Sequence, residues 1–270
     1  MCCTLGQVPS PACASIDLLP PQKLHMFPLI RGWTGVQRSP ETNLRLGLVL
    51  TFVAGATNAG GFLAVGSYTS HMTGIVSSVA DDLVLGNITL ALAGIVCLLA
   101  FVAGAMCTAV LVNWGLRQQL RSSYSLPLLL ESGALLVFGL FGAAIAAWSK
   151  LFVPVTVVLL CFIMGLQNAV ITKISKAEIR TTHVTGLVTD LGIELGKLLY
   201  MNRSQPGTPV RANRQRLRVH LVLVLGFFLG GLMGALGFKY WGYITTVPLA
   251  ALLWVLCLRP LLVDLRWRAA

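Results

Sequence analysis

Two short segments hold most of the side chains of this sequence that could bind a solute or move a proton. They read Thr69-Ser70-His71-Met72-Thr73-Gly74 and Thr181-Thr182-His183-Val184-Thr185-Gly186. Histidine gains or loses a proton near neutral pH, and the free N–H groups at the start of a helix favour an anion. We therefore predict that a helix begins in each segment, with threonine or serine as its cap, and that its N-terminus can hold an anionic solute.

Acidic residues follow both histidines at helical spacing. Read as helices, the two stretches each carry one polar face, made of His71, Gly74, Ser78 and Asp82 in the first and of His183, Gly186, Asp190 and Glu194 in the second. Carboxylates inside a membrane carry protons or bind cations. A cation site at the far ends of these segments therefore competes with the anion site at their starts, and at a membrane surface the same carboxylates would only be solvated.

Each segment is preceded by a second repeated motif, Gly55-x-x-Asn58-Ala59 in the first case and Gly165-x-x-Asn168-Ala169 in the other. The two motifs recur in the same order and at nearly the same spacing, which indicates an internal duplication. The candidate substrate-binding residues are Asn58, His71, Thr73, Gly74, Asp82, Asn168, His183, Thr185, Gly186, Asp190 and Glu194.

The composition predicts a membrane protein. Hydrophobic residues make up 56% of the chain and charged residues 11%, with a mean hydropathy of +0.80, whereas about a quarter of the residues of a soluble domain are charged. A membrane-spanning helix needs about 20 mostly apolar residues. Six runs approach this length: Leu46 to Gly66, Ile88 to Val112, Leu126 to Trp148, Leu151 to Thr172, His220 to Phe238 and Tyr243 to Leu258.

The distribution of positive charge predicts the orientation, because cytoplasmic loops retain lysine and arginine. With six spans, 18 of these residues lie on one side and only Lys150 and Lys239 on the other. An eight-span arrangement would carry Asp81 and Asp82 through the bilayer, at about 2.5 to 3.5 kcal/mol for such a residue at a helix centre. We predict six spans in the inner membrane with both termini in the cytoplasm.

The fold class predicted is an all-α membrane protein with six transmembrane helices in an inverted 3+3 repeat, because a block of three spans inverts the block that follows it. Each repeat has an extra segment after its first span, either re-entrant or lying amphipathically along the membrane surface. Small residues at four-residue spacing, as in Gly226-xxx-Gly230-xxx-Gly234 and Ala100-xxx-Gly104-xxx-Thr108, predict close helix packing.

The predicted organisation has four parts. Residues 1–45 are a proline-rich, disordered cytosolic lead, in which Met26 is an alternative start that would make residues 1–25 upstream sequence. Residues 46–148 form the first three-span repeat. Residues 149–259 form the second, with a basic cytosolic loop at 201–219, and residues 260–270 are a cytosolic tail.

Other function classes find little support in the sequence. It has no Cys-x-x-Cys, P-loop, Rossmann or zinc-protease motif, so we expect no cofactor and no metal. The net charge of +11 needs no nucleic-acid partner, because an arginine-rich loop is explained by anionic lipid headgroups. A homo-oligomer is compatible with the sequence.

At these motifs the chain resembles the YoaK-like bacterial membrane proteins, a family also described as domain of unknown function 1275. The resemblance rests on Gly55-x-x-Asn58-Ala59, His71-Met72-Thr73-Gly74, Gly165-Leu166-Gln167-Asn168-Ala169 and Thr181-Thr182-His183-Val184-Thr185-Gly186, and covers about residues 42 to 260. It implies a six-span inner-membrane protein with no established substrate or reaction, and it supplies no catalytic residues.

The function predicted is that of a secondary transporter or permease for a small solute, an anion being the natural guest, with the site between the repeats. A membrane scaffold or assembly partner, in which the two histidine segments only pack, is the alternative. An intramembrane enzyme ranks third, because each copy holds histidine, threonine and a carboxylate but no nucleophile motif.

Overall fold

The computed structural model describes residues 39–175, 181–200 and 209–269. Residues 1–38 of the predicted lead and residues 201–208 of the predicted basic loop lie outside the described residues. The regular elements of the described part are all helices, with no strand, which confirms the all-α prediction for these residues. The elements are α1 (Pro40–Val65), α2 (Met72–Val84), α3 (Ile88–Arg117), α4 (Ser125–Ile174), α5 (Val184–Leu199), α6 (Arg214–Trp241), the short 3₁₀ helix η2 (Gly242–Thr245) and α7 (Thr246–Ala269).

Two of the long helices begin several residues before the apolar runs that the sequence marks. Ser39 and Thr42 form a reciprocal capping box at the start of α1, and Pro40 occupies its first turn. The side chain of Asn213 accepts hydrogen bonds from the N–H groups of Gln215 and Arg216 and so begins α6 within the predicted loop. Hydropathy marks where lipid could surround a helix, whereas capping decides where the helix starts.

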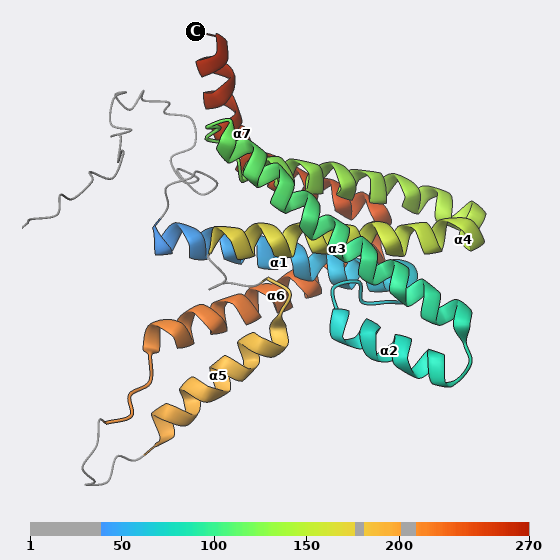
Figure 1. Ribbon diagram of the computed structural model, residues 1–270, viewed down its shortest axis with the longest axis horizontal. Helices are drawn as coiled ribbons and strands as arrows, with labels where there is room; N and C mark the ends of the chain where they lie inside the picture. The colour runs from blue at the N-terminus through green and yellow to red at the C-terminus, as the bar shows by residue number, and fades with distance from the viewer. Residues whose placement is uncertain (1–38, 176–180, 201–208, 270) are drawn as a thin grey trace, which may run out of the picture. The chain divides into compact units, whose positions relative to one another are not determined.

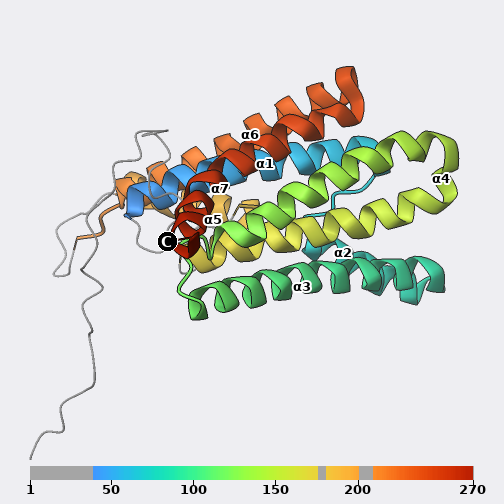
Figure 2. The ribbon, with the colours of Figure 1, turned by 90° about the horizontal axis from the view of Figure 1, so that it is seen from above.

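Within the described residues, four helical segments are long and apolar enough to cross a membrane: Glu41–Val65, Ile88–Arg117, Pro154–Ile174 and Arg214–Arg266. The last of these joins α6, η2 and α7, and Figure 2 shows the chain reversing its direction between α6 and α7. The ribbon of α4 also doubles back on itself (Figures 1 and 2), with a shorter apolar segment, Ser125–Leu140, before the turn and Pro154–Ile174 after it. We call these segments the first and second arms of α4.

The long helices pack in pairs that are distant in sequence. Helix α1 lies against α6, and α3 lies against α4 (Figures 1 and 2). Glycines bring the backbones together, because a Cβ on Gly55 or Gly230 would overlap the carbonyl of Phe227 or Phe52. Between α3 and α4, Gly104 and Gly165 touch the backbone of the facing helix in the same way. The predicted packing role of the small residues is confirmed.

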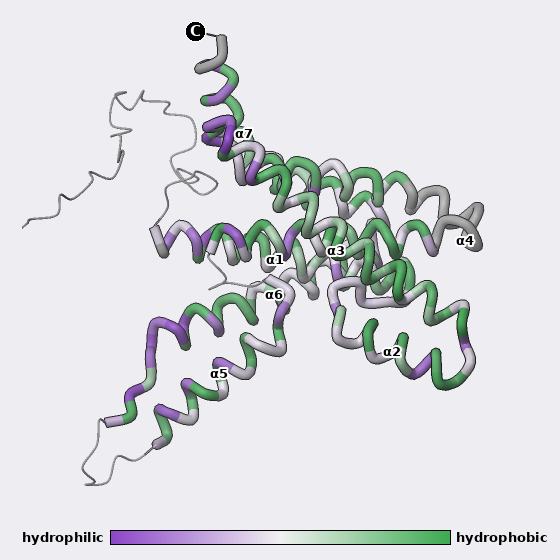
Figure 3. The backbone as a smooth tube through the Cα atoms, in the orientation of Figure 1, coloured by the Kyte–Doolittle hydropathy of each residue, from purple (hydrophilic) through white to green (hydrophobic). Residues whose placement is uncertain are grey.

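Helices α2 and α5 are too short to span a bilayer and pack on α3 and α6, respectively. In Figure 1 both begin near the middle of the length of α1 and run apart from there, α2 to the right and α5 to the left. Figure 3 shows hydrophilic residues at the start of α1 and of α6 and near the end of α7, at the left of the view, whereas α3 is hydrophobic over most of its length.

Candidate functional site

The repeated asparagines hold the segments that lead into the two short helices. Asn58 Oδ1 accepts hydrogen bonds from Ser70 Oγ at 2.8 Å and Ser70 N at 3.4 Å. Asn168 Oδ1 accepts one from Thr182 Oγ1 at 2.7 Å. Asn58 and Asn168 each lie about 10 Å before the end of their helix at a rise of 1.5 Å per residue. In both copies, therefore, a residue just before the short helix lies beside the long helix, about two turns before the end of that helix.

The histidines occupy the N-cap positions of α2 and α5, and neither makes a side-chain capping bond. Both are exposed, and each imidazole lies over the glycine three residues on, because a Cβ on Gly74 or Gly186 would overlap the ring. The sequence-based expectation that threonine or serine would cap these helices is therefore wrong. Ser70 and Thr182 bind the asparagines instead. The position of each imidazole explains the glycine in each motif, because any side chain there would overlap the ring.

Thr73 and Thr185, in the first turns of α2 and α5, are exposed beside the histidines. The first N–H groups of these helices thus have no side-chain acceptor from the cap residue. Unpaired N–H groups at a helix start attract negative charge. The geometry is compatible with the predicted anion site at each segment.

Four buried polar side chains lie in or directly beside the repeated motifs of α1 and the second arm of α4. Gln167 Nε2 donates a hydrogen bond of 3.0 Å to the Leu50 carbonyl of α1. A Cβ on Gly61 would lie 3.1 Å from Leu160 Cδ1 and 3.9 Å from Thr69 Oγ1. The polar crossing, as we call it, consists of Thr57, Thr69, Gln167 and Thr181, which are at most 1% exposed.

Each member of the polar crossing has an oxygen with no hydrogen-bond partner among the described residues: Oγ1 of Thr57, Thr69 and Thr181, and Oε1 of Gln167. A buried polar atom left unpaired costs about 1–3 kcal/mol. The hydroxyls can donate as well as accept, so the crossing offers donors to a polar guest and carries no fixed charge.

Asp82 and Glu194 lie toward the C-terminal ends of α2 and α5, away from the histidines, and each accepts hydrogen bonds from nearby residues. Asp82 Oδ1 accepts a hydrogen bond of 3.3 Å from Asn87, the N-cap residue of α3. Glu194 accepts 2.7 Å and 2.6 Å hydrogen bonds from Lys197 Nζ and from the N–H of Asn213, the N-cap residue of α6. The Lys197 bond, followed by that of Asn213, lowers the pKa of the Glu194 carboxyl.

Asp190 is exposed on α5, and its Oδ2 lies 3.9 Å from Nε2 of His220 on α6. The structure thus brings together Asn58 and the residues around His71 in one cluster, and Asn168 and the residues around His183 in the other. It places Asp82 and Glu194 toward the ends of the short helices, which run apart (Figure 1), and Asp190 near the middle of α5. No observation assigns a ligand to either set, and the binding roles remain predictions.

Sequence reasoning missed two features. Thr57 and Gln167 occupy the same position in the repeated Gly-x-x-Asn motif, directly before the asparagine, and this matched polar position was the available signal. Glu131 is the acidic residue inside the run Leu126 to Trp148, and it is fully buried in the first arm of α4. A charged residue within an apolar run was the signal there.

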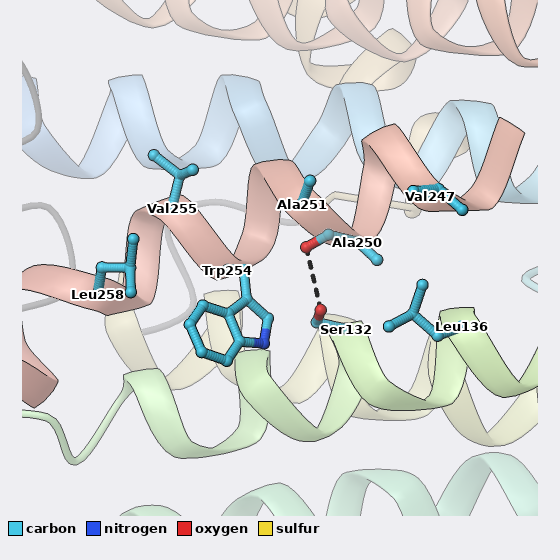
Figure 4. Close-up of a pocket in the computed structure, with 8 residues that line it drawn as sticks. All are labelled: Ser132, Leu136, Val247, Ala250, Ala251, Trp254, Val255 and Leu258. Atoms are coloured by element: carbon cyan, nitrogen blue, oxygen red, sulfur yellow. Dashed lines mark hydrogen bonds between the residues drawn. The ribbon is translucent and has the colours of Figure 1, made fainter.

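An open pocket of about 380 Å³ lies between the first arm of α4 and α7 (Figure 4). Its lining residues are Ser132, Leu136, Val247, Ala250, Ala251, Trp254, Val255 and Leu258. The hydroxyl of Ser132 is already bonded to the Ala250 carbonyl at 3.0 Å, so the pocket offers a nearly apolar surface. It does not include the repeated motifs.

Residues 46–258 match the model of a family described as "Protein of unknown function (DUF1275)". The chain belongs to this family. The match covers both motif copies and confirms the resemblance seen in the sequence. No curated protein and no solved structure matches the chain significantly. The description of the DUF1275 family assigns no activity.

Proposed function

We propose that this DUF1275 protein is a secondary transporter or permease for a small solute, and that the solute passes the polar crossing between α1 and the second arm of α4. The observation that carries the proposal is the set of buried, unpartnered oxygens on Thr57, Thr69, Gln167 and Thr181. All four lie in or directly beside the repeated motifs. Unpaired polar atoms are costly in a packed protein, and a polar guest that visits this place would satisfy them.

The helix pairing supports a two-body mechanism. One body consists of α1, α5 and α6, and the other of α2, α3 and the second arm of α4, because α1 and α5 pack on α6, whereas α2 and α4 pack on α3. Each short helix belongs to the body that does not contain the long helix preceding it. The bonds from Asn58 to Ser70 and from Asn168 to Thr182 therefore join the two bodies. Rocking of one body against the other would expose the crossing to each side in turn.

The proposed topology has six spans in an inverted 3+3 repeat, with α2 and α5 re-entrant from opposite faces. The turn of α4 and the reversal at η2 supply the additional crossings of the membrane. Hydrophilic helix ends at the left of Figure 3 support a cytoplasmic face there. We place the protein in the inner membrane with both termini in the cytoplasm.

An anion is the solute class that we propose. The helix starts at His71 and His183 present N–H groups, and the polar crossing adds hydroxyl donors but no carboxylate. The competing cation site is weakened because Glu194 already binds Lys197 and Asn213. The exposed arginines at the start of α6, namely Arg211, Arg214, Arg216 and Arg218, suit anionic lipid headgroups.

Purified protein in nanodiscs should be screened for thermal stabilisation by acetate, succinate, phosphate and sulfate, with choline and spermidine as cations, from about pH 5.5 to about 8 around the ordinary histidine range. Any stabilising anion is then tested for flux in proteoliposomes. Thr69→Val and Thr181→Val remove unpartnered hydroxyls at nearly constant volume. We expect them to leave the solute-free protein as stable as the wild type, or more so, and to reduce flux at least tenfold.

The matched control is Thr189→Val, which removes an exposed hydroxyl on α5 that is bonded to the Thr185 carbonyl. Stabilisation by cations alone would move the proposal to the carboxylates. A folded protein that binds no probe and shows no flux would favour the scaffold alternative. Full flux in the double valine variant would refute the role of the polar crossing.

A further inference from the structure

Glu131 is a carboxyl group buried inside the helix bundle, away from the repeated motifs. Its exposed fraction is 0%, and both Oε1 and Oε2 lack a hydrogen-bond partner among the described residues. It lies on the same stripe of α4 as Leu128, Leu135 and Phe138, all fully buried. An apolar stripe of this kind faces the core, where no water compensates a charge.

The surroundings favour the neutral acid. An ionised carboxylate in an apolar interior costs so much free energy that the group takes up a proton instead. On α7, the titratable group that Glu131 influences is the Cys257 thiol, which donates a 3.5 Å hydrogen bond to the Ser125 carbonyl. Among the described residues, no cation forms an ion pair with Glu131.

Other charged groups on neighbouring helices are placed elsewhere. Asp264 of α7 accepts hydrogen bonds from the N–H groups of Arg121 and Ser122, before α4 begins. Arg45 lies in the second turn of α1, and Arg117 is in the last turn of α3. Arg259 of α7 has a buried Nη1 without a hydrogen-bond partner among the described residues, and within this part of the chain it forms no ion pair with Glu131.

We propose that Glu131 is a proton-binding site inside the membrane, whose deprotonation is linked to separation of the first arm of α4 from the helices packed on it. In the packed state the carboxyl holds its proton. When the helices separate, water reaches the group and accepts the proton, leaving the carboxylate. Resting on the transport function proposed above, this inference makes the proton the ion coupled to solute movement.

The linkage between proton binding and helix packing sets how strongly helix separation depends on pH. If the packed form holds one proton that the separated form releases, the equilibrium constant for separation rises about tenfold per pH unit above the range where the free acid ionises. Replacing the carboxyl by an amide removes this pH dependence without introducing a charge.

The protonation state can be read from the carbonyl stretching band of the neutral acid by infrared spectroscopy of the full chain in nanodiscs. We expect the band at pH 7 in the wild type and in Glu41→Gln, which changes an exposed carboxylate, and its loss in Glu131→Gln. If the folded wild type lacks the band at pH 7, the proposal is overturned. Loss of the band when sodium replaces choline would identify a sodium site and would also overturn it.

Helix separation is measured by alkylation of Cys257, which is buried between α7 and α4. N-ethylmaleimide is added from about pH 7 to about 9, and peptide mass spectrometry follows this cysteine alone. The rate in the wild type, divided by the rate in Glu131→Gln, should rise up to about tenfold per pH unit. Glu131→Asp keeps a titratable group and should retain the rise.

A ratio that stays constant with pH would refute the link between proton and packing. Neither measurement uses a solute, so a failure to find flux would count against the proposed function and leave the proton site standing. If Glu131→Gln does not fold, the infrared and alkylation profiles of Glu131→Asp decide, because both must follow pH as in the wild type.

Discussion

Replacing Gly165 by alanine tests the close approach of α3 and α4 on which the two bodies depend. A Cβ at this position would overlap the Phe101 carbonyl oxygen and lie 2.8 Å from the carbonyl carbon and 3.1 Å from Cα. Since these are backbone atoms, no side chain can swing away, and the helices themselves must separate.

Overpacking of this kind costs about 1–3 kcal/mol, and a rigid backbone neighbour puts the cost near the upper end. Alanine regains up to about 1 kcal/mol as a better helix former than glycine. We therefore expect Gly165→Ala to destabilise the protein by about 2 kcal/mol. Gly104→Ala, on the facing helix, should behave alike, and the double variant should be non-additive because both contacts share one interface.

The matched control is Gly133→Ala, because nothing lies within 4 Å of a Cβ built on Gly133 of the first arm of α4. The free energy of unfolding of this variant should equal that of the wild type or exceed it by up to about 1 kcal/mol. Titration with SDS in nanodiscs or mild detergent, followed by tryptophan fluorescence, gives the free energy of unfolding of the wild type and of each variant. Equal stability of Gly165→Ala and Gly133→Ala would refute the backbone contact.

Three further predictions follow from the hydrogen bonds and the proposed topology. Asn168→Ala should leave Thr182 Oγ1 unpaired and cost about 1–3 kcal/mol in the same titration, whereas an unchanged free energy would show that this bond is not needed. Because the pKa of Glu194 is lowered in the folded protein, its stabilisation is present above the carboxyl pKa of the unfolded chain and is lost as pH falls through the folded pKa; Glu194→Gln should flatten the acid side of the stability profile measured by thermal unfolding. Cysteines at exposed Pro209, which precedes α6, and at exposed Tyr240, near the end of α6, should be labelled by a membrane-impermeant maleimide from the cytoplasm and the periplasm, respectively. Labelling of both from one side would exclude the proposed crossing.

The sequence by itself determined that the chain belongs in a membrane, that it is helical and that its motifs are repeated. Apolar composition excludes an ordinary soluble domain. Runs of about 20 apolar residues predict helices, because a chain inside lipid must satisfy its backbone N–H and C=O groups by local hydrogen bonds. The small residues around Gly104 and Gly230 likewise predicted close packing, since only small side chains permit it. Family membership follows from the motifs without any contact being known.

Tertiary structure alone decided which side chains meet. Nothing in the local sequence states that α1 pairs with α6 and α3 with α4, because such contacts depend on how distant faces fit together. For the same reason Ser70 and Thr182, which suit helix caps, bind Asn58 and Asn168 instead. The burial of Glu131 and the local bonds of Glu194 arise in this way too: the chemistry of a carboxyl group depends on what the fold packs around it.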